Sequence, residues 1–145
     1  MDLCGSLVCD AVDRDGTFLD VGCASGYLME CMERWAAERG YSVAPYGLDI
    51  SHELAALARS RLPRWADRIY TGNAMTWTPA RRFDFVRTGL EYVPQRRRRD
   101  LVQRLLDEFV AERGRLVVGT YAGEPVETAV ADELEREVSS WGFNV

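Results

Sequence analysis

The chain contains no lysine, so all 18 of its basic residues are arginines. A P-loop needs a lysine to reach nucleotide phosphates, and pyridoxal enzymes hold their cofactor on a lysine, so both classes are excluded. The chain also lacks an apolar run long enough to cross a membrane. Residues 1–16 carry acids where a signal peptide is apolar. We expect a cytoplasmic protein that contacts no membrane.

Metal ligands are sparse. The single histidine, His52, has no ligand companion nearby in the sequence, and we expect no catalytic role for it. The four cysteines, Cys4, Cys9, Cys23 and Cys31, form no C-x-x-C pair. We therefore predict no metal site and four reduced thiols.

The net charge of −5 argues against a general nucleic-acid surface. One basic run, residues 96–99, has two interpretations. In the first, the run is a phosphate-binding patch. In the second, it belongs to a solvated outer face of the helix, where Asp100 can pair with Arg96 or Arg104, and Arg104 also with Glu108. We favour the second interpretation and expect no nucleic-acid partner.

Apolar strands alternate with amphipathic helices along the whole chain, which is typical of a single α/β domain with a parallel sheet. We assign residues 1–145 to that domain. Leu54, Leu57, Ala58 and Leu62 are expected to form the buried stripe of the second helix. The predicted helices cover 26–40, 51–62 and 94–112, with a last one from Pro125, and the predicted strands cover 18–21, 42–48, 68–71, 83–87 and 115–121, with the start of a sixth at 141–145.

The most informative motif is TFLDVGCASG, residues 17–26. A buried strand ends on Asp20, and Gly22 then allows a sharp turn. Gly26 leaves room where the next helix approaches the strand. The small residues at 23–25 let backbone N–H groups and the positive end of that helix face a ligand. The motif predicts a site for an anionic group.

Dinucleotide sites use the same turn with the pattern G-x-G-x-x-G, but this chain has Gly22, Ala24 and Tyr27 at those places. The charge of Asp20 would also repel a pyrophosphate. A nicotinamide-dependent oxidoreductase, which shares the topology, is therefore disfavoured. An amino-acid group fits better, because its ammonium can meet Asp20 and its carboxylate the helix N-terminus.

A second acid follows about one βα unit later, where YGLDI places Asp49 at the end of the next strand, 23 residues after Gly26. This is the length of a helix plus a strand. The alternative is a doubly wound domain whose glycines serve only a tight turn. Two strand-terminal acids at this spacing have no packing purpose, so we favour a cofactor site.

These motifs resemble those of the class I S-adenosylmethionine-dependent methyltransferases. Asp20, Gly22 and Gly26 match the first motif, with Ala24 in place of the middle glycine. The resemblance implies a Rossmann-like, doubly wound parallel sheet of order 3-2-1-4-5. It also implies S-adenosyl-L-methionine as the cofactor.

The resemblance further implies roles for individual residues. The first turn would hold the amino-acid portion and Asp49 the ribose, while TGNA at 71–74 would hold adenine, with Asn73 replacing the usual aspartate. The implied cofactor-binding residues are Asp20, Gly22, Cys23, Ala24, Gly26, Asp49, Ile50, Asn73, Ala74 and Thr88.

The segment TGLEYVP at 88–94 follows strand four and, in this family, faces the transferred methyl group. Glu91 and Tyr92 are thus the candidate catalytic residues, with the glutamate accepting a proton from an alcohol or amine of a small-molecule substrate. The alternative is that Glu91 is solvated and Tyr92 packs at the helix entry.

The chain departs from the family at its ends. Full-length members add an N-terminal lid helix and an antiparallel seventh strand, whereas here about sixteen residues precede the first strand and the chain stops at Val145. This short or truncated domain suggests a second hypothesis: a non-catalytic S-adenosylmethionine-binding module, a partner subunit or a fragment. A homo-oligomer or a partner would then complete the substrate pocket.

Overall fold

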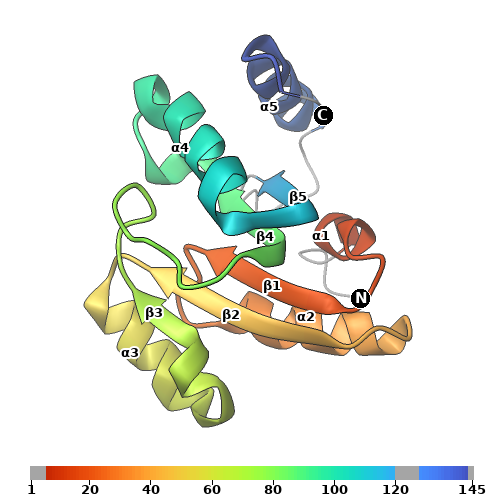
Figure 1. Cartoon of the computed structure of the whole chain (residues 1–145), viewed down its shortest axis with the longest axis vertical. Helices are drawn as coiled ribbons and strands as arrows, with labels where there is room; N and C mark the ends of the chain where they lie inside the picture. The colour runs from red at the N-terminus through yellow and green to blue at the C-terminus, as the bar shows by residue number, and fades with distance from the viewer. Residues whose placement is uncertain (1–5, 120–127, 144–145) are drawn as a thin grey trace.

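The computed structural model describes residues 6–119 and 128–143, and within them it forms a five-stranded parallel sheet (Figure 1). The strand order β3-β2-β1-β4-β5 is the one predicted. Helices flank the sheet, as in a doubly wound Rossmann-like fold. The strands are β1 Gly16–Val21, β2 Val43–Asp49, β3 Ile69–Thr71, β4 Phe83–Gly89 and β5 Val110–Gly119.

The helices follow the predicted alternation, with one addition at the start of the chain, α1, that was not predicted. Short 3₁₀ turns at Pro63–Arg68, Leu90–Tyr92 and Gln95–Arg97 connect the longer elements. The α-helices are α1 Ser6–Ala11, α2 Tyr27–Glu38, α3 His52–Arg61, α4 Arg98–Arg104 and α5 Thr128–Ser140.

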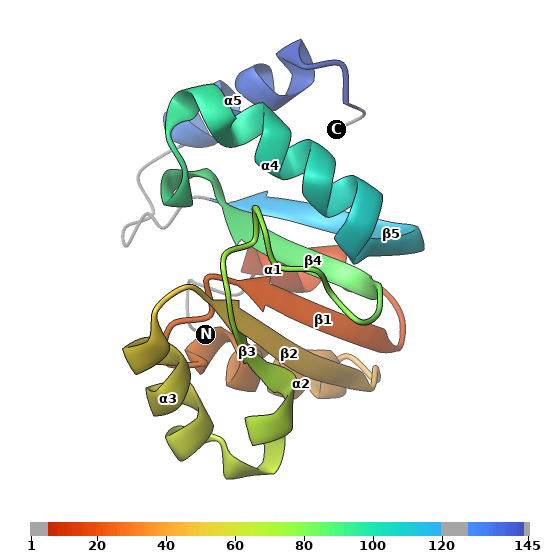
Figure 2. The ribbon, with the colours of Figure 1, turned by 60° about the vertical axis from the view of Figure 1, so that its left-hand side comes forward.

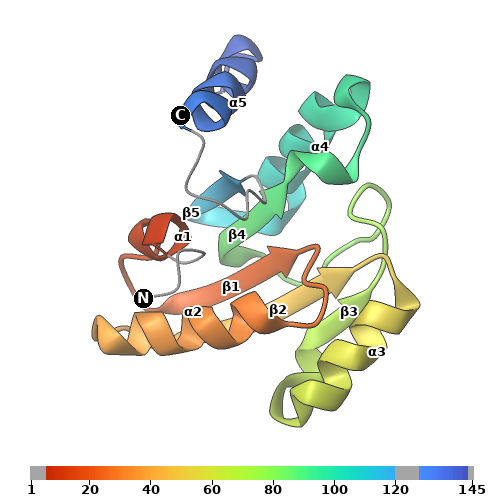
Figure 3. The ribbon, with the colours of Figure 1, turned by 180° about the vertical axis from the view of Figure 1, so that it is seen from behind.

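The central strands are buried on both faces because their side chains alternate between two helical layers. Phe18 and Phe85 pack against α2, which lies along β1 and β2 (Figure 3). Their neighbours Leu19 and Val86 pack on the other face, in a cluster that includes Leu101 of α4 (Figure 2). Burying each such side chain contributes about 1.5–3 kcal/mol, so this double core stabilises the central strands.

Helix α3 begins as predicted, and two of its four predicted stripe residues, Ala58 and Leu62, are buried. The Ser51 hydroxyl caps it by accepting a hydrogen bond from the Leu54 N–H at 3.2 Å. Leu54 and Leu57 are exposed, so their predicted burial is wrong. The buried stripe is Ala55, Ala58 and Leu62. The side chain of Leu62 packs directly on Gly26, at a point where any side chain on residue 26 would collide with it.

The predicted helix over 94–112 is divided differently. Helix α4 begins only at Arg98 and passes into a π-helical turn, Leu105–Phe109, and β5 begins at Val110. Phe83 pairs with Val110 and Phe85 with Arg115, so the segment between them bulges out of the ladder. The predicted helix end at Gly114 is wrong for this reason.

The C-terminal segment does not form the predicted sixth strand within the residues described. Trp141 and Phe143 instead follow α5 in a turn, with their rings in edge-to-face contact at 6.4 Å. Pro125, the end of predicted strand five and residues 144–145 lie outside the described residues. None of the described helices combines the length and apolarity needed to cross a bilayer.

Two of the four predicted thiols can be placed. Cys23 and Cys31 are both buried, and Cys23 is a free thiol. Cys31 lies on the core side of α2, as expected. Cys4 and the side chain of Cys9 lie outside the described part of the chain.

Candidate functional site

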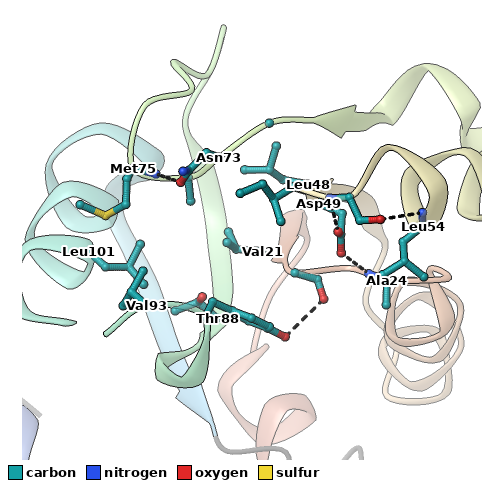
Figure 4. Close-up of a pocket in the computed structure, with 16 residues that line it drawn as sticks. Val21, Ala24, Leu48, Asp49, Leu54, Asn73, Met75, Thr88, Val93 and Leu101 are labelled. Atoms are coloured by element: carbon teal, nitrogen blue, oxygen red, sulfur yellow. Dashed lines mark hydrogen bonds between the residues drawn. The ribbon is translucent and has the colours of Figure 1, made fainter. Parts of the chain in front are cut away.

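A cavity of about 340 Å³ opens at the carboxyl ends of β1, β2 and β4 (Figure 4). This is the edge where doubly wound folds bind ligands, and the volume is in the range of small-molecule pockets. Eight predicted site residues line the cavity: Gly22, Ala24, Asp49, Ile50, Asn73, Ala74, Thr88 and Tyr92.

The glycine turn between β1 and α2 forms one wall. Gly22 and Gly26 have φ of 85° and 82°, a left-handed conformation that glycine adopts without strain. The N–H groups of Gly22 and Cys23 both donate to the Leu48 carbonyl, which ties the turn to β2. Ala24 is also left-handed, with φ of 48°, so its backbone needs support from outside the turn.

Asp49 gives that support. One carboxylate oxygen accepts the Ala24 N–H at 2.8 Å, and the other accepts the Ser51 N–H at 2.8 Å (Figure 4). The side chain is only 7% exposed but reaches the cavity wall. Each carboxylate oxygen has a second lone pair, so Asp49 can still accept hydrogen bonds from a ligand.

Asp20 lies beneath the turn and does not line the cavity. It is 2% exposed and forms an ion pair with Arg87, which is 5% exposed, at 3.3 Å. The two residues are register partners on β1 and β4. Asp20 therefore already has a cationic partner from its own chain.

Burial dominates the electrostatics below the turn. It raises the pKa of Asp20, although the charge and hydrogen bond of Arg87 act against it. Burial acts to lower the pKa of Arg87, but the charges of Asp20 and Tyr92 and hydrogen bonds with both side chains together raise it above its usual value. Burial, with the charges of Asp20 and Asp49, raises the pKa of Cys23 to about 12, so this thiol is protonated at neutral pH.

Tyr92 covers the turn from the opposite wall. Its hydroxyl donates to the Gly22 carbonyl at 3.5 Å, and its ring occupies the space beside Gly22. Burial raises the pKa of Tyr92 despite the opposing charge of Arg87. Glu91 is exposed and not on the cavity wall, with its carboxylate against Gly89. Of the two candidate catalytic residues, the fold brings Tyr92 to the cavity.

The far wall comes from the segment after β3. The Asn73 side-chain oxygen accepts the Met75 N–H at 2.9 Å. Arg104 on α4 ties this segment down by donating to the carbonyls of Ala74 at 2.8 Å and Trp77 at 2.7 Å. It also pairs with Glu108 at 2.9 Å, as predicted. A residue expected on an outer face thus also positions the cavity wall.

The other conspicuous charged residues lie away from the wall. Arg98 pairs with Glu137 of α5 at 3.1 Å, and Arg96, Arg97 and Arg99 are exposed. His52 is exposed as the first residue of α3 and does not line the cavity. Among the residues described, no three His, Cys, Asp or Glu side chains gather as a metal site requires.

No protein-family model matches the chain, and no curated protein matches its sequence. Solved structures do match. The ribosomal protein L11 methylase of Lactobacillus delbrueckii subsp. bulgaricus superposes with a TM-score of 0.64 at 18% identity, covering 96% of this chain and 66% of that one. A methyltransferase of Geobacter sulfurreducens in complex with S-adenosyl-L-homocysteine gives 0.61 at 18% identity, covering 94% and 61%.

The chain has the fold of S-adenosylmethionine-dependent methyltransferases. It spans about two thirds or less of the length of these structures. The same fold also carries other chemistry, because the [4+2]-cyclase SpnF matches with a TM-score of 0.62 at 19% identity, covering 93% of this chain and 55% of that one. The reaction therefore has to be argued from the site.

Within this methyltransferase fold, four predicted site residues do not reach the cavity wall: Asp20, Cys23, Gly26 and Glu91. Several residues that do line it were not predicted, among them Met75, Val93 and Leu101.

Arg87 was also missed. An arginine inside the apolar strand FDFVRTG was the available signal, because a charge buried in a central strand needs a partner on a neighbouring strand.

Proposed function

We propose that this protein binds S-adenosyl-L-methionine in the cavity and transfers its methyl group to a small molecule. The observation that carries the proposal is Asp49, a nearly buried carboxylate on the cavity wall that is linked to the glycine turn of β1. A carboxylate at the end of β2 is suited to accept both hydroxyl groups of a ribose.

The residues present fit the rest of such a cofactor. Gly26 caps α2 without a side-chain hydrogen bond, so the start of this helix, next to the cavity-lining Ala24, can meet a carboxylate. Ile50, exposed at the rim, and Ala74 offer apolar surface for adenine, and Asn73 offers an amide. This assignment of residues is part of the proposal.

The cofactor would supply an electrophilic methyl group, so the protein's main task is alignment of the substrate and exclusion of water. Thr88 and Tyr92 line the cavity at the end of β4, where a substrate would approach. Tyr92 is the better candidate for contact with a substrate, since Glu91 does not line the cavity. A dedicated base is not required for this chemistry.

Calorimetric titration with S-adenosylhomocysteine tests the proposal. We expect binding by the unaltered protein and at least tenfold weaker binding by Asp49→Ala, because hydrogen bonds to a charged group contribute about 1.5–3 kcal/mol. Asp67→Ala, at an exposed aspartate outside the cavity, is the matched control. Absence of binding, or equal affinity for the Asp49 variant, would contradict the proposal.

The second candidate function is a binding module without turnover. The position of Glu91 off the cavity wall favours it, since one of two candidate catalytic groups is then missing from the site. Release of S-adenosylhomocysteine in assays with a panel of small-molecule acceptors distinguishes the two functions. Binding without any turnover would support the module.

The cellular location, the class of substrate and the partners of the protein are also proposals. The free thiol of Cys23 supports a reducing, cytoplasmic environment. A small molecule remains the proposed substrate, and a homo-oligomer or a partner subunit that completes the pocket stays a prediction. The mass of the protein in solution, measured by light scattering, checks the last point.

A further inference from the structure

The ring of Tyr92 occupies one end of the cavity. A Cβ placed on Gly22 would lie 2.6 Å from Cε2 of Tyr92 and 2.6 Å from its hydroxyl oxygen. The ring therefore rests on Gly22, one of the two glycines of the turn. No ligand group can contact Gly22 from that side while the ring is there.

This end of the cavity is the one suited to an amino-acid group. The helix N-terminus beyond the turn favours a carboxylate, and the sequence predicts Asp20 as the partner of an ammonium. Asp49, Ile50 and Asn73 also line the cavity and are suited to a nucleoside. The ring of Tyr92 thus covers the part of the site beside Gly22.

The charges below the turn also disfavour an amino-acid group. Arg87 neutralises Asp20 through their ion pair, and both side chains are buried. A ligand ammonium would therefore gain little from Asp20. Neither the shape nor the charge of this end favours an amino-acid group in the present arrangement.

Resting on the proposed function, we propose that Tyr92 determines the ligand specificity of this cavity. A nucleoside thioether without an amino-acid group binds in the arrangement seen here. A ligand that carries the amino-acid group must first displace the Tyr92 ring from Gly22.

The structure allows this displacement without unfolding. Tyr92 is 47% exposed, and displacing it breaks two hydrogen bonds: the long one to the Gly22 carbonyl, at 3.5 Å, and one with the side chain of Arg87. Leu90, the first residue of the same 3₁₀ turn, is 2% exposed and packs against Val102 of α4, which anchors the turn. The side chain can therefore rotate while the backbone of the turn stays in place.

Calorimetric titrations with 5′-methylthioadenosine and S-adenosylhomocysteine test the proposal. The measured quantity is the dissociation constant of S-adenosylhomocysteine divided by that of 5′-methylthioadenosine. In Tyr92→Ala we expect this ratio to fall about fivefold or more, because only the amino-acid ligand has to displace the ring. An unchanged or larger ratio would overturn the proposal.

Two further variants make the test specific. Tyr92→Phe keeps the ring over Gly22, so its ratio should stay within about twofold of the unaltered protein; a fall as large as in Tyr92→Ala would overturn the role of the ring. Leu57→Ala removes an equally exposed side chain, 46%, that lies outside the cavity, and should leave both constants unchanged.

Circular dichroism melting confirms that each variant is folded before titration. Failure of the unaltered protein to bind either ligand would contradict both the proposed function and this inference. Binding of both ligands with a ratio insensitive to Tyr92→Ala would contradict the inference alone.

Discussion

The Asp49 carboxylate accepts the Ala24 N–H at 2.8 Å and so joins the end of β2 to the turn that follows β1. Ala24 has a positive φ that is unfavourable for alanine, and this hydrogen bond holds it there. The residue best placed to bind a ribose is thus also the one that shapes the glycine turn. Cofactor binding and the local stability of the turn are expected to depend on the same side chain.

The first prediction concerns this double role. Asp49→Ala should lower the free energy of unfolding by about 1–3 kcal/mol, because two backbone N–H groups in part-buried hydrogen bonds lose their acceptor. Asp49→Asn keeps one acceptor oxygen and should lose roughly half as much. Urea denaturation measures both values, with Asp67→Ala as the exposed control. Equal stability of all four proteins would show that the two hydrogen bonds contribute nothing.

The buried ion pair gives the second prediction. Arg87→Met leaves the carboxylate of Asp20 buried without its cationic partner and should destabilise the protein by about 3–5 kcal/mol. The double variant Asp20→Leu, Arg87→Met removes both charges and should recover most of that loss. Chemical denaturation of both single variants and of the double variant gives the coupling energy. Additive effects would mean that the two side chains do not interact.

The third prediction is a pH dependence from Cys23, whose pKa is raised to about 12 by burial and by the charges of Asp20 and Asp49. The folded protein holds this proton more tightly than the unfolded chain does. The stabilisation is therefore complete below the pKa of the unfolded thiol and is lost as the pH rises towards 12.

Cys23→Ala lacks this titration. The difference in free energy of unfolding between the unaltered protein and Cys23→Ala should shrink as the pH rises above 9. Urea denaturation at several pH values measures the difference. A difference that stays constant with pH would show that the Cys23 pKa is not raised.

Arg104 gives the fourth prediction. Its guanidinium holds the carbonyls of Ala74 and Trp77, so Arg104→Ala should destabilise the protein by about 1–3 kcal/mol. Loosening this segment should also weaken binding of an adenine nucleoside. Arg99→Ala, at an exposed arginine of the same helix, is the matched control for stability and affinity. Equal effects of the two variants on stability and affinity would contradict a positioning role for Arg104.

Much of the fold could be predicted because its signals are local. The central strands are continuous apolar runs, and Ser51 marks the start of α3 by a capping pattern that needs only neighbouring residues. The boundary between α4 and β5 could not be predicted. Residues up to Glu112 continue a helical pattern, and only pairing of Val110 with Phe83 ends it.

Site residues near the ends of strands could be predicted, because the strand order brings those ends to one edge of the sheet. Asp49, Asn73 and Thr88 lie at the ends of β2, β3 and β4, and all reach the cavity. Residues whose place depends on side-chain direction were harder to assign. Asp20 and Glu91 were expected in the site, but one points into an ion pair and the other lies against Gly89.

The amino-acid sequence alone determined the alternation of strands and helices, the glycine turn and the two acids at strand ends, because hydrophobic period and glycine content act over a few residues. The tertiary structure decided which acid faces the cavity, since Arg87 comes from a strand 67 residues away. It also decided that Tyr92 rests on Gly22. Such contacts depend on register and burial, which exist only once the sheet has formed.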